Sequence, residues 1–316
     1  MKNKPVLNLV IPCYNEEQAL PYTEKVLNEK MKQLMEDGLV DKKSRVVLVN
    51  DGSKDRTWEA ITEMHDTNPM YVGIKLSRNK GHQNALLAGL MYAKDHADIA
   101  ISMDADLQDD IQVIDDMIEK YKKGAEIVYG VRSSRVKDSF FKRFTAEGFY
   151  HFMSLMGVDV VFNHADCRLM SHLALEGLAE YKEVNLFLRG IVPQIGYQTD
   201  IAYYERNERV AGESKYPLKK MLSFAMDGIT SFSVKPLRMI ASIGFVILLL
   251  SFIILIYSVI MKLMGNTVSG WTFIVCSIWL IGGIQTLCLG VIGEYIGKIY
   301  NESKHRPRFI VEKTID

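Results

Sequence analysis

Two long uncharged stretches near the C-terminus constrain this chain more than any other feature. The first runs from Met239 to Met261, 23 residues without a charge, and the second runs from Leu263 to Gly293. A helix rises 1.5 Å per residue, so the first stretch would cover roughly 34 Å, enough to cross the hydrocarbon core of a bilayer. Core helices of soluble proteins seldom need twenty uncharged residues twice in succession. We therefore predict a membrane hairpin with helices near 237–261 and 271–293.

The flanks of these stretches predict the orientation of the hairpin. Gly265, Asn266 and Gly270 mark a short turn, and Trp271 stands where an interfacial aromatic residue would anchor the second helix. The turn carries only Lys262, whereas many cations lie outside the two stretches: Lys215, Lys219, Lys220, Lys235, Arg238, Lys298, Lys304, Arg306, Arg308 and Lys313. By the positive-inside rule, both ends of the hairpin and the whole N-terminal domain would be cytoplasmic. The expected location is the inner (plasma) membrane, with two spans.

Two further segments have more than one interpretation. Apolar residues within 216–236 recur at helical spacing beside Lys219 and Lys220, as in a helix lying in the headgroup layer or in a packed core helix. The aromatic and basic residues of 135–152 allow the same two interpretations. We expect four parts: a cytoplasmic domain (1–215), an amphipathic juxtamembrane segment (216–236), the hairpin (237–293) and a cytoplasmic tail (294–316).

Charge and cysteine content exclude several classes of protein. Lys and Arg together number 38, equal to Asp and Glu together, so net charge gives no argument for a nucleic-acid partner. The four cysteines form no CxxC pair, which argues against a disulfide framework or a zinc site. This cysteine pattern is best explained by a protein that resides in a reducing compartment.

The N-terminal part alternates strand-like and helix-like segments. Strands are expected near 6–11, 45–50, 71–76, 99–103 and 126–129, with helices near 16–37, 55–65, 80–96 and 110–123. This alternation predicts an α/β domain with a mostly parallel, Rossmann-like sheet. Ligands bind such sheets beyond the carboxyl ends of the strands, and polar clusters follow four strands, at 14–16, 51–53, 78–81 and 104–109. We expect these four loops to form one site. The sequence contains no GxGxxG or P-loop motif, which argues against a dinucleotide-binding fold or a P-loop protein.

Four motifs carry a family resemblance. VIPCYNEE, VNDGSKDRT, SRNKGHQNALLAG and MDADLQD, in this order and spacing, resemble the inverting GT-A glycosyltransferases of family 2. DCRLM, RNERVAGESKYP and the two apolar stretches narrow the resemblance to polyprenyl-phosphate glycosyltransferases, such as dolichyl-phosphate mannose synthases and bactoprenol glucosyltransferases. The resemblance covers essentially the whole chain. It implies a GT-A fold and transfer of a hexose from a nucleotide-sugar to polyprenyl (undecaprenyl) phosphate, with UDP-glucose favoured over UDP-N-acetylglucosamine and GDP-mannose.

The acidic motif predicts a divalent cation. Asp104, Asp106 and Gln108 form a DxDxQ element, and alternation along an extended segment would point all three side chains the same way. Hard oxygen ligands suit Mg²⁺ or Mn²⁺ bridging a diphosphate. An isolated DxD is equally often a solvated acidic turn, so the family context favours the metal. Asp106 is also assigned to catalysis.

The resemblance also implies ligands for the two substrates. The nucleotide-sugar would contact Pro12, Tyr14, Asn15, Glu16, Asp51, Ser53, Lys80, Gly81 and Asp104. Asn15 and Asp51 could instead cap the helices that follow them. The phosphates would be bound by Arg132, Arg206, Arg209 and Lys215, since guanidinium groups hold phosphate oxygens in a forked geometry. A solvated basic face is the alternative for Arg206 and Arg209.

Asp166, in DCRLM, corresponds by resemblance to a carboxylate near the reacting centre. It could orient the acceptor or act as a base. Cys167 replaces the Phe common in the family; we do not expect it to be a nucleophile. The expected partners are the donor, the lipid acceptor and the bilayer, together with a second copy packed through small residues of the hairpin, and a flippase. A processive polysaccharide synthase would need more spans and a QxxRW motif, so the different class kept open is a non-catalytic nucleotide-sugar-binding scaffold for a flippase.

Overall fold

A computed structural model of the protein shows two compact units. Unit 1 comprises residues 1–150, 160–216 and 306–316, and unit 2 comprises residues 151–159 and 217–305. The structure describes residues 4–132, 156, 164–184, 186–205, 229–230, 233–264 and 270–316.

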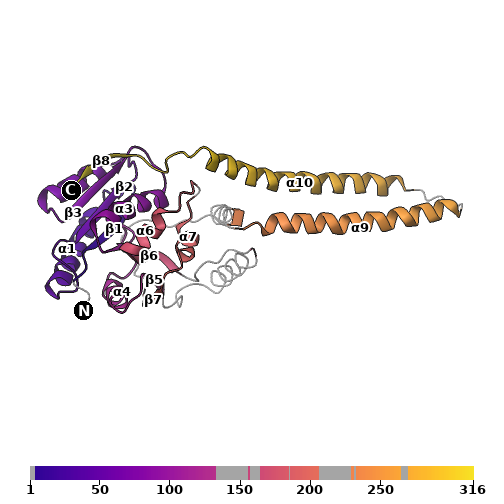
Figure 1. Ribbon diagram of the computed structural model, residues 1–316. Coiled ribbons are helices and arrows are strands. Elements are labelled where there is room, and N and C mark those ends of the chain that lie inside the picture. The colour runs from indigo at the N-terminus through magenta and orange to yellow at the C-terminus, as the bar shows by residue number, and fades with distance from the viewer. Residues whose placement is uncertain are drawn as a thin grey trace. The chain divides into compact units, whose positions relative to one another are not determined.

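Unit 1 contains an eight-stranded sheet in the order β7-β5-β6-β4-β1-β2-β3-β8 (Figure 1). The strands are β1 (Leu7–Cys13), β2 (Arg45–Asn50), β3 (Tyr71–Leu76), β4 (Ile99–Ser102), β5 (Ile127–Arg132), β6 (His164–Ser171), β7 (Thr199–Tyr204) and β8 (Val311–Ile315). The helices of this unit are α1 (Leu20–Glu36), α2 (Thr57–Thr67), α3 (His82–His96), α4 (Val113–Lys122), α6 (His172–Ala179) and α7 (Leu188–Gln194).

The centre of the sheet is parallel. β1 pairs in parallel with β2 and β4, and β2 pairs in parallel with β3. All seven residues of β1 are buried, as expected for a strand covered by helices on both faces. In α1 the buried residues include Leu20, Leu27, Met31 and Leu34, spaced so that one face of the helix meets the core. The carboxyl ends of these strands share one edge, which we call the carboxyl edge.

β6 brings a later part of the chain to the carboxyl edge. It runs antiparallel between β4 and β5, with Ser102 opposite Arg168 and Val131 opposite His164. The start of β6 therefore lies beside the ends of β4 and β5. β7 runs parallel to β5, with Tyr204 opposite Arg132, so β7 ends at the same edge. The predicted strands were only the first five; β6 and β7 were not anticipated.

The C-terminal residues add an unpredicted strand. β8 pairs antiparallel with β3 and places Ile315 opposite Gly73. Lys75 forms an ion pair with Glu312 at 2.7 Å, with both side chains partly exposed. A Cβ atom at Gly73 would lie 2.8 Å from Ile315 Cγ1, so glycine there allows the close approach. The segment 311–315, predicted as part of a tail, is therefore an edge strand of the domain.

Unit 2 is a hairpin of two long apolar helices. α9 (Lys235–Leu263) has 29 residues and α10 (Trp271–Ser303) has 33, and the two lie side by side (Figure 1). At 1.5 Å per residue they measure about 44 and 50 Å, longer than a hydrocarbon core of about 30 Å. Each contains a stretch long and apolar enough to cross a membrane, Lys235–Ile254 and Leu280–Ser303.

The observed bounds differ from the predicted ones mainly at one end. α10 continues to Ser303, ten residues beyond the predicted 293, because the absence of charge was used as the criterion and the last three turns carry charged residues. Residues 265–269 of the predicted turn, the segment 135–152 and residues 216–228 lie outside the described residues.

Candidate active site

The loops after β1 and β2 are joined by hydrogen bonds. The backbone N–H of Asn15 donates to Ser53 Oγ at 3.0 Å, and the N–H of Lys54 donates to Asn15 Oδ1 at 2.9 Å. The N–H of Glu16 donates to Thr57 Oγ1 at 2.8 Å. Asn15 has a φ of 57°, a left-handed conformation that Asn tolerates better than most residues. The structure thus brings together Asn15, Glu16 and Ser53, as predicted.

The neighbouring predicted residues differ in accessibility. Tyr14 follows β1 and its side chain is exposed, so its ring is available for stacking. Pro12, in contrast, lies inside β1, buried and opposite Val49. The strand extends two residues beyond the predicted end at Ile11, so the side chain of Pro12 packs inside the sheet, and its contact with the nucleotide stays a prediction.

Asp51 organises the loop after β3. Its carboxylate accepts hydrogen bonds from the N–H of Lys80 at 2.7 Å and of Gly81 at 2.9 Å. Burial raises the pKa of Asp51, and these two backbone N–H groups oppose the rise. Gly52 adopts a φ of +61°, and a Cβ atom there would lie 2.4 Å from the backbone nitrogen of Asn79. Lys80 and Gly81 are thus positioned by Asp51.

The capping alternative for Asn15 and Asp51 is not what the structure shows. Helices α1 and α2 begin without a side-chain cap. Both residues instead connect neighbouring loops at the carboxyl edge. They contribute to the geometry of the site whether or not they also touch a ligand.

The acidic motif forms a turn, so the predicted extended conformation is wrong. The N–H of Leu107 donates to the carbonyl of Asp104 at 3.3 Å, and Leu107 has a φ of 45°. Asp104 and Asp106 are partly exposed, whereas the side chain of Gln108 is buried. The reason is that the chain turns back into the domain, where the buried Asp109 accepts a hydrogen bond from the Tyr204 hydroxyl at 2.6 Å.

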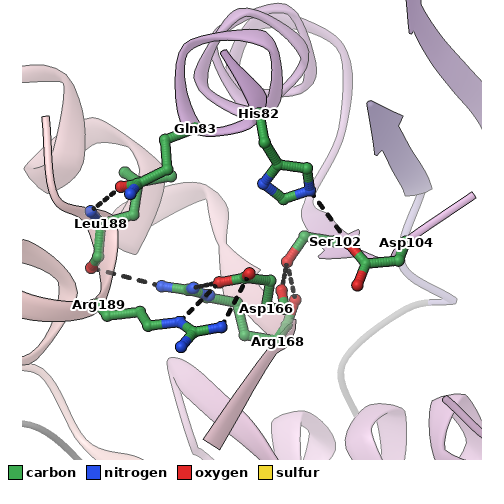
Figure 2. A network of polar contacts seen from close by, with 8 residues as sticks. All are labelled: His82, Gln83, Ser102, Asp104, Asp166, Arg168, Leu188 and Arg189. Atoms are coloured by element: carbon green, nitrogen blue, oxygen red, sulfur yellow. Dashed lines mark hydrogen bonds and ion pairs between the residues drawn. The ribbon is translucent and has the colours of Figure 1, made fainter. Parts of the chain in front are cut away.

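A polar network connects the acidic turn to β6 and α7 (Figure 2). His82 Nε2, at the start of α3, lies 3.1 Å from Asp104 Oδ1. Asp166 accepts two hydrogen bonds from Arg189, at 3.1 and 3.0 Å, and one from Arg168 Nη2 at 3.2 Å. Arg168 is almost completely buried, with 1% of its surface exposed. Four elements far apart in the sequence therefore contribute charged groups to one place.

The electrostatics of the network keep Asp166 ionised. Burial alone would raise the pKa of Asp166, but the charges and hydrogen bonds of Arg189 and Arg168 hold it well below its usual range. Burial lowers the pKa of the Arg168 guanidinium, and Asp166 opposes that change. A carboxylate held by two guanidinium groups is a weak base. The geometry therefore favours orientation over proton transfer as the role of Asp166.

His82 is affected by the same carboxylates. Its partial burial lowers the pKa of the imidazole, but the hydrogen bond and charge of Asp104, with the charge of Asp166, outweigh burial and raise it above 6.5. A larger fraction of His82 is therefore cationic near neutral pH than for a free histidine.

Backbone contacts fix the position of this network. Ser102 Oγ donates to the carbonyl of Asp166 at 2.5 Å, which ties the end of β4 to the start of β6. Gln83 Oε1 accepts from the N–H of Leu188 at 2.8 Å, and Arg168 Nη1 donates to the carbonyl of Leu188 at 3.5 Å. The start of α7, which carries Arg189, is thereby held against α3 and β6 (Figure 2).

Three residues of the network were missed by sequence reasoning. Arg168 follows Asp166 by two positions in a strand, and this period-2 spacing could have paired them. His82 stands inside a motif that was recognised, but it was not assigned a role. Arg189 lies 23 residues after Asp166 in a different element, so no local pattern connects the two.

The predicted phosphate-binding residues lie mostly outside the described residues, whereas Cys167 lies in the core. Arg132 ends β5 at the carboxyl edge, but its side chain is outside the described residues, as are Arg206, Arg209 and Lys215. Cys167 is fully buried, and burial raises the pKa of its thiol well above the ordinary value. A buried neutral thiol fits the expectation that Cys167 is not a nucleophile.

The donor set fits a divalent cation that is shared with a substrate. Asp104 and Asp106 offer two partly exposed carboxylates from one turn. Mg²⁺ is commonly held by one or two carboxylates, substrate phosphates and water rather than by a complete protein cage. In the part of the chain that the structure describes, no group of three or more His, Cys, Asp or Glu side chains could hold a metal ion. The residues present therefore match a cation completed by a diphosphate.

Comparison with known families decides the class of the protein. The model for Glycosyl transferase family 2 matches residues 8–179, which include β1, the acidic turn and Asp166. The chain belongs to this family. A second model, the GtrB C-terminal hairpin, matches residues 235–299 of this glycosyltransferase. The mostly parallel α/β sheet followed by the hairpin confirms the predicted GT-A fold with two long apolar helices.

The relatives of this glycosyltransferase match it over nearly their full length. The uncharacterized glycosyltransferase YkoT of Bacillus subtilis (strain 168) is 51% identical over 311 residues, 98% of this chain and 92% of that protein. The bactoprenol glucosyl transferase of Shigella phage SfV is 41% identical over 308 residues, 97% of this chain and 98% of that protein. The prophage bactoprenol glucosyl transferase homolog of Escherichia coli (strain K12) is 40% identical over 311 residues, 97% of this chain and 98% of that protein.

Proposed function

We propose that this enzyme transfers glucose from UDP-glucose to undecaprenyl-type polyprenyl phosphate at the cytoplasmic face of the membrane, with inversion at the anomeric carbon. The product would serve the glycosylation of a cell-envelope glycan. The observation that carries the proposal is the 41% identity to a bactoprenol glucosyl transferase across 97% of this chain, which includes both the polar carboxyl edge and the hairpin. UDP-N-acetylglucosamine and GDP-mannose are the alternative donors.

The donor would bind across the loops at the carboxyl edge. The exposed Tyr14 ring offers a stacking surface for the base, and Asn15 and Ser53 hold the first two loops together beside it. Asp104 and Asp106 would hold Mg²⁺ or Mn²⁺, which when bound neutralises the charge that develops on the departing diphosphate. His82 keeps Asp104 in position through its Nε2 contact of 3.1 Å.

The chemistry of the acceptor explains why no strong base is needed. A phosphate monoester has a second pKa near 6, so it is mostly dianionic at neutral pH. One of its oxygens forms a bond to the anomeric carbon as the bond from that carbon to the diphosphate oxygen breaks, and the electron pair leaves with the nucleoside diphosphate. Asp166, with its lowered pKa, would orient Arg189 rather than accept a proton.

Cations at the carboxyl edge would position the acceptor phosphate. Arg132, Arg206, Arg209 and Lys215 remain the predicted ligands. We add Arg189, whose side chain is 29% exposed while Asp166 fixes its orientation. A guanidinium held by a carboxylate on one side can present its remaining N–H groups to a phosphate on the other.

The decisive test is direct identification of the product. Detergent-solubilised full-length protein is incubated with polyprenyl phosphate, Mg²⁺ or Mn²⁺ and each of the three nucleotide-sugars, and the lipid fraction is analysed by mass spectrometry. We expect a hexosyl polyprenyl phosphate with UDP-glucose. Nucleotide-sugar binding without a lipid product from any donor would contradict the proposal and favour the non-catalytic scaffold.

The acidic turn supplies a matched pair of variants. Asp106→Ala should reduce transfer by at least about 100-fold, the scale seen when one electrostatic group is removed from a catalytic site. Asp95→Ala removes an exposed carboxylate that pairs with Lys94 on α3 and should leave the rate unchanged. Retained transfer by Asp106→Ala, with normal melting behaviour, would refute its assignment to the cation.

A further inference from the structure

The backbone of the acidic turn is held by a side chain from α1. The Thr23 hydroxyl lies 2.8 Å from the carbonyl oxygen of Ala105, the residue between Asp104 and Asp106. Thr23 is 1% exposed and Ala105 is 5% exposed, so this hydrogen bond is shielded from water. The two residues are 82 positions apart in the sequence. A buried hydroxyl from a distant helix therefore contacts the middle of the turn.

The Thr23 hydroxyl is available to Ala105 although a second carbonyl lies near it. Its oxygen is also 3.0 Å from the carbonyl oxygen of Ala19, one helical turn earlier. A hydroxyl has one hydrogen and donates to one acceptor at a time. The Ala19 carbonyl already accepts from the backbone N–H of Thr23 at 3.0 Å, whereas no described backbone N–H donates to Ala105. Donation to Ala105 therefore satisfies a buried carbonyl that the turn itself leaves unpaired.

This hydrogen bond acts on the peptide plane that leads into Asp106. The carbonyl of Ala105 and the nitrogen of Asp106 belong to one planar group, so fixing the oxygen fixes the direction in which Asp106 leaves the backbone. The carboxylate of Asp104 lies 3.1 Å from His82 Nε2 (Figure 2). The carboxylate of Asp106 accepts from the N–H of Gln108 at 3.3 Å. The hydroxyl adds a constraint on the backbone between these two carboxylates.

α1 is itself attached to the segments on both sides of the site. Lys30, on the same helix, is 3% exposed, and its Nζ lies 2.6 Å from Asp115 Oδ2 and 2.7 Å from Gln112 Oε1. Gln112 precedes α4 and Asp115 lies in the first turn of that helix. At the other end, the N–H of Leu20 donates to the carbonyl of Glu16 at 3.0 Å. α1 thus connects the loop after β1 with the chain that follows the acidic turn.

We propose that Thr23 is a positioning residue for the divalent cation, because its hydroxyl fixes the acidic turn so that Asp104 and Asp106 present their carboxylates to one ion. The inference rests on the proposed function, which assigns the cation to this turn. Without the hydrogen bond the peptide plane at Ala105 can rotate. Ordering the turn must then take place when the ion binds, and its cost weakens binding.

The test measures cation binding and not turnover. Full-length protein in detergent is titrated with Mn²⁺ in the presence of UDP, and the free ion is followed by electron paramagnetic resonance. Thr23→Val keeps the shape of the side chain and removes the hydroxyl, so the Kd for Mn²⁺ should rise about tenfold as a buried carbonyl loses its donor. Thr23→Ala should give a rise of the same order. Thr23→Ser retains the hydroxyl and should bind Mn²⁺ as wild type does.

Three controls separate positioning from a general loss of order. Asp106→Ala defines the background from other sites on the protein. Thr62→Val removes an equivalent hydroxyl on α2, which donates within its own helix to the carbonyl of Trp58 at 2.9 Å, and should leave Mn²⁺ binding unchanged. Binding of UMP in the presence of EDTA, measured by calorimetry, should be the same in Thr23→Val as in wild type. A loosened domain would instead weaken both ligands.

Wild-type Mn²⁺ affinity in folded Thr23→Val and Thr23→Ala would overturn the inference, as would equal weakening of Mn²⁺ and UMP. A loss in Thr23→Ser as large as that in Thr23→Val would assign the effect to packing and also overturn it. If the wild-type protein binds no Mn²⁺ with UDP, the inference fails together with the cation assignment. Mn²⁺ binding in the expected order, without a lipid product from any nucleotide-sugar, would contradict the proposed transfer alone and support the role of Thr23.

Discussion

Arg168 is a charged side chain held almost completely inside the protein. Taking a guanidinium from water to the interior is costly, and attraction to a partner offsets that cost only when the geometry is good. Here Asp166 supplies the opposite charge at 3.2 Å, and the carbonyl of Leu188 accepts a further hydrogen bond. Hydrophobic residues could fill the same space at a similar or lower free energy. The pair is better explained by the orientation it imposes on Asp166 and Arg189 than by stability.

Replacing Asp166 should lower the stability of the protein, because it leaves the buried charge of Arg168 without its counter-ion. Asp166→Asn leaves Arg168 without its counter-ion, and we expect the free energy of unfolding to fall by about 3 kcal/mol, the lower end for a broken buried pair because Asp166 is partly exposed. Denaturant titration of the detergent-solubilised protein measures this loss. Glu312→Gln, which removes a partly exposed partner of Lys75, is the control and should cost less than about 1 kcal/mol. Equal losses in the two variants would contradict the assignment.

The lowered pKa of the Asp166 carboxylate determines how its contribution to stability depends on pH. Its pKa is lowered from an ordinary 3.8 in the folded state, so its contribution is fully present above that value and is lost only as pH falls toward the folded pKa. The difference in unfolding free energy between wild type and Asp166→Asn should therefore not narrow from pH 8 to about pH 5. It should widen as His82 becomes protonated, because the charge of Asp166 raises the pKa of that imidazole. It should narrow only in stronger acid. A difference that narrows between pH 8 and 6 would show that another group controls the pair.

Gly52 and Gly81 differ in what a Cβ atom would contact, so replacing each by alanine separates backbone strain from steric clash. Both have positive φ, but a Cβ atom at Gly52 would lie within 2.9 Å of the backbone of Arg78 and Asn79, whereas at Gly81 nothing lies within 4 Å. Gly81→Ala should therefore cost roughly 1–3 kcal/mol, the conformational penalty alone, because its φ of 85° and ψ of 153° lie in a region that only glycine populates readily. Gly52→Ala should cost more and should also raise KM for the donor, because the loop that Asp51 holds must move. Similar melting temperatures for the two variants would argue against this contact.

At the scale of elements, the antiparallel strand β6 builds the site. Parallel strands place their carboxyl ends at one edge, but only an antiparallel strand can bring its beginning to that edge. Asp166 and Arg168 reach the end of β4 in this way, and α7 then returns Arg189 to them. The acidic turn is the second such element, since its tight geometry buries Gln108 and leaves Asp104 and Asp106 accessible.

The edge strand β8 should stabilise unit 1 although its residues are mostly exposed. It covers the edge of β3, which would otherwise present unpaired N–H and C=O groups, and Ile315 packs against the core. Ile315→Ala should lower the free energy of unfolding by roughly 1–2 kcal/mol, below the range for a fully buried isoleucine. Ile310→Ala, at an exposed side chain just before the strand, should be near neutral. Equal effects in thermal unfolding would mean that β8 contributes only its backbone.

At the scale of the whole molecule, β8 limits how the chain can cross a bilayer. The chain leaves unit 1 before α9 and returns to its sheet after α10. A folded sheet cannot be divided by a membrane, so the segment before α9 and the segment after α10 must lie on the same side. An even number of crossings follows from the fold itself, independently of charge. By the positive-inside rule, the cations at both ends favour the cytoplasm as that side, in agreement with the proposed function.

Reporter fusions test this topology. Green fluorescent protein fused after Asp316 should fluoresce in cells, because it folds in the cytoplasm. Alkaline phosphatase inserted at 265–269 should be active, because it requires an oxidising compartment. The same phosphatase fused after Asp316 should be inactive and serves as the control. Activity at both positions would contradict a two-span hairpin.

Local patterns in the sequence were sufficient for several conclusions. Hydrophobic periodicity and the uncharged stretches located the first strands, their helices and the hairpin, because these signals arise from residues a few positions apart. The motifs after β1, β2 and β4 located the carboxyl edge for the same reason. Family resemblance identified the glycosyltransferase class. The DxDxQ element was found, but its conformation was misjudged, since whether a short polar segment extends or turns depends on what its neighbours bury.

Only the tertiary structure decided which distant residues meet. Asp166 binds Arg189 because the antiparallel strand β6 carries it to the carboxyl edge. Lys75 forms an ion pair with Glu312, 237 positions away in the sequence. Such contacts leave no periodic trace, because they depend on strand order and on the path of the chain between elements. Sequence by itself therefore determined the first five strands with their helices, the chemistry available and the two long apolar helices. The folded sheet determined which charges stand together, because long-range pairing is set by the packing of the whole core and not by neighbours along the chain.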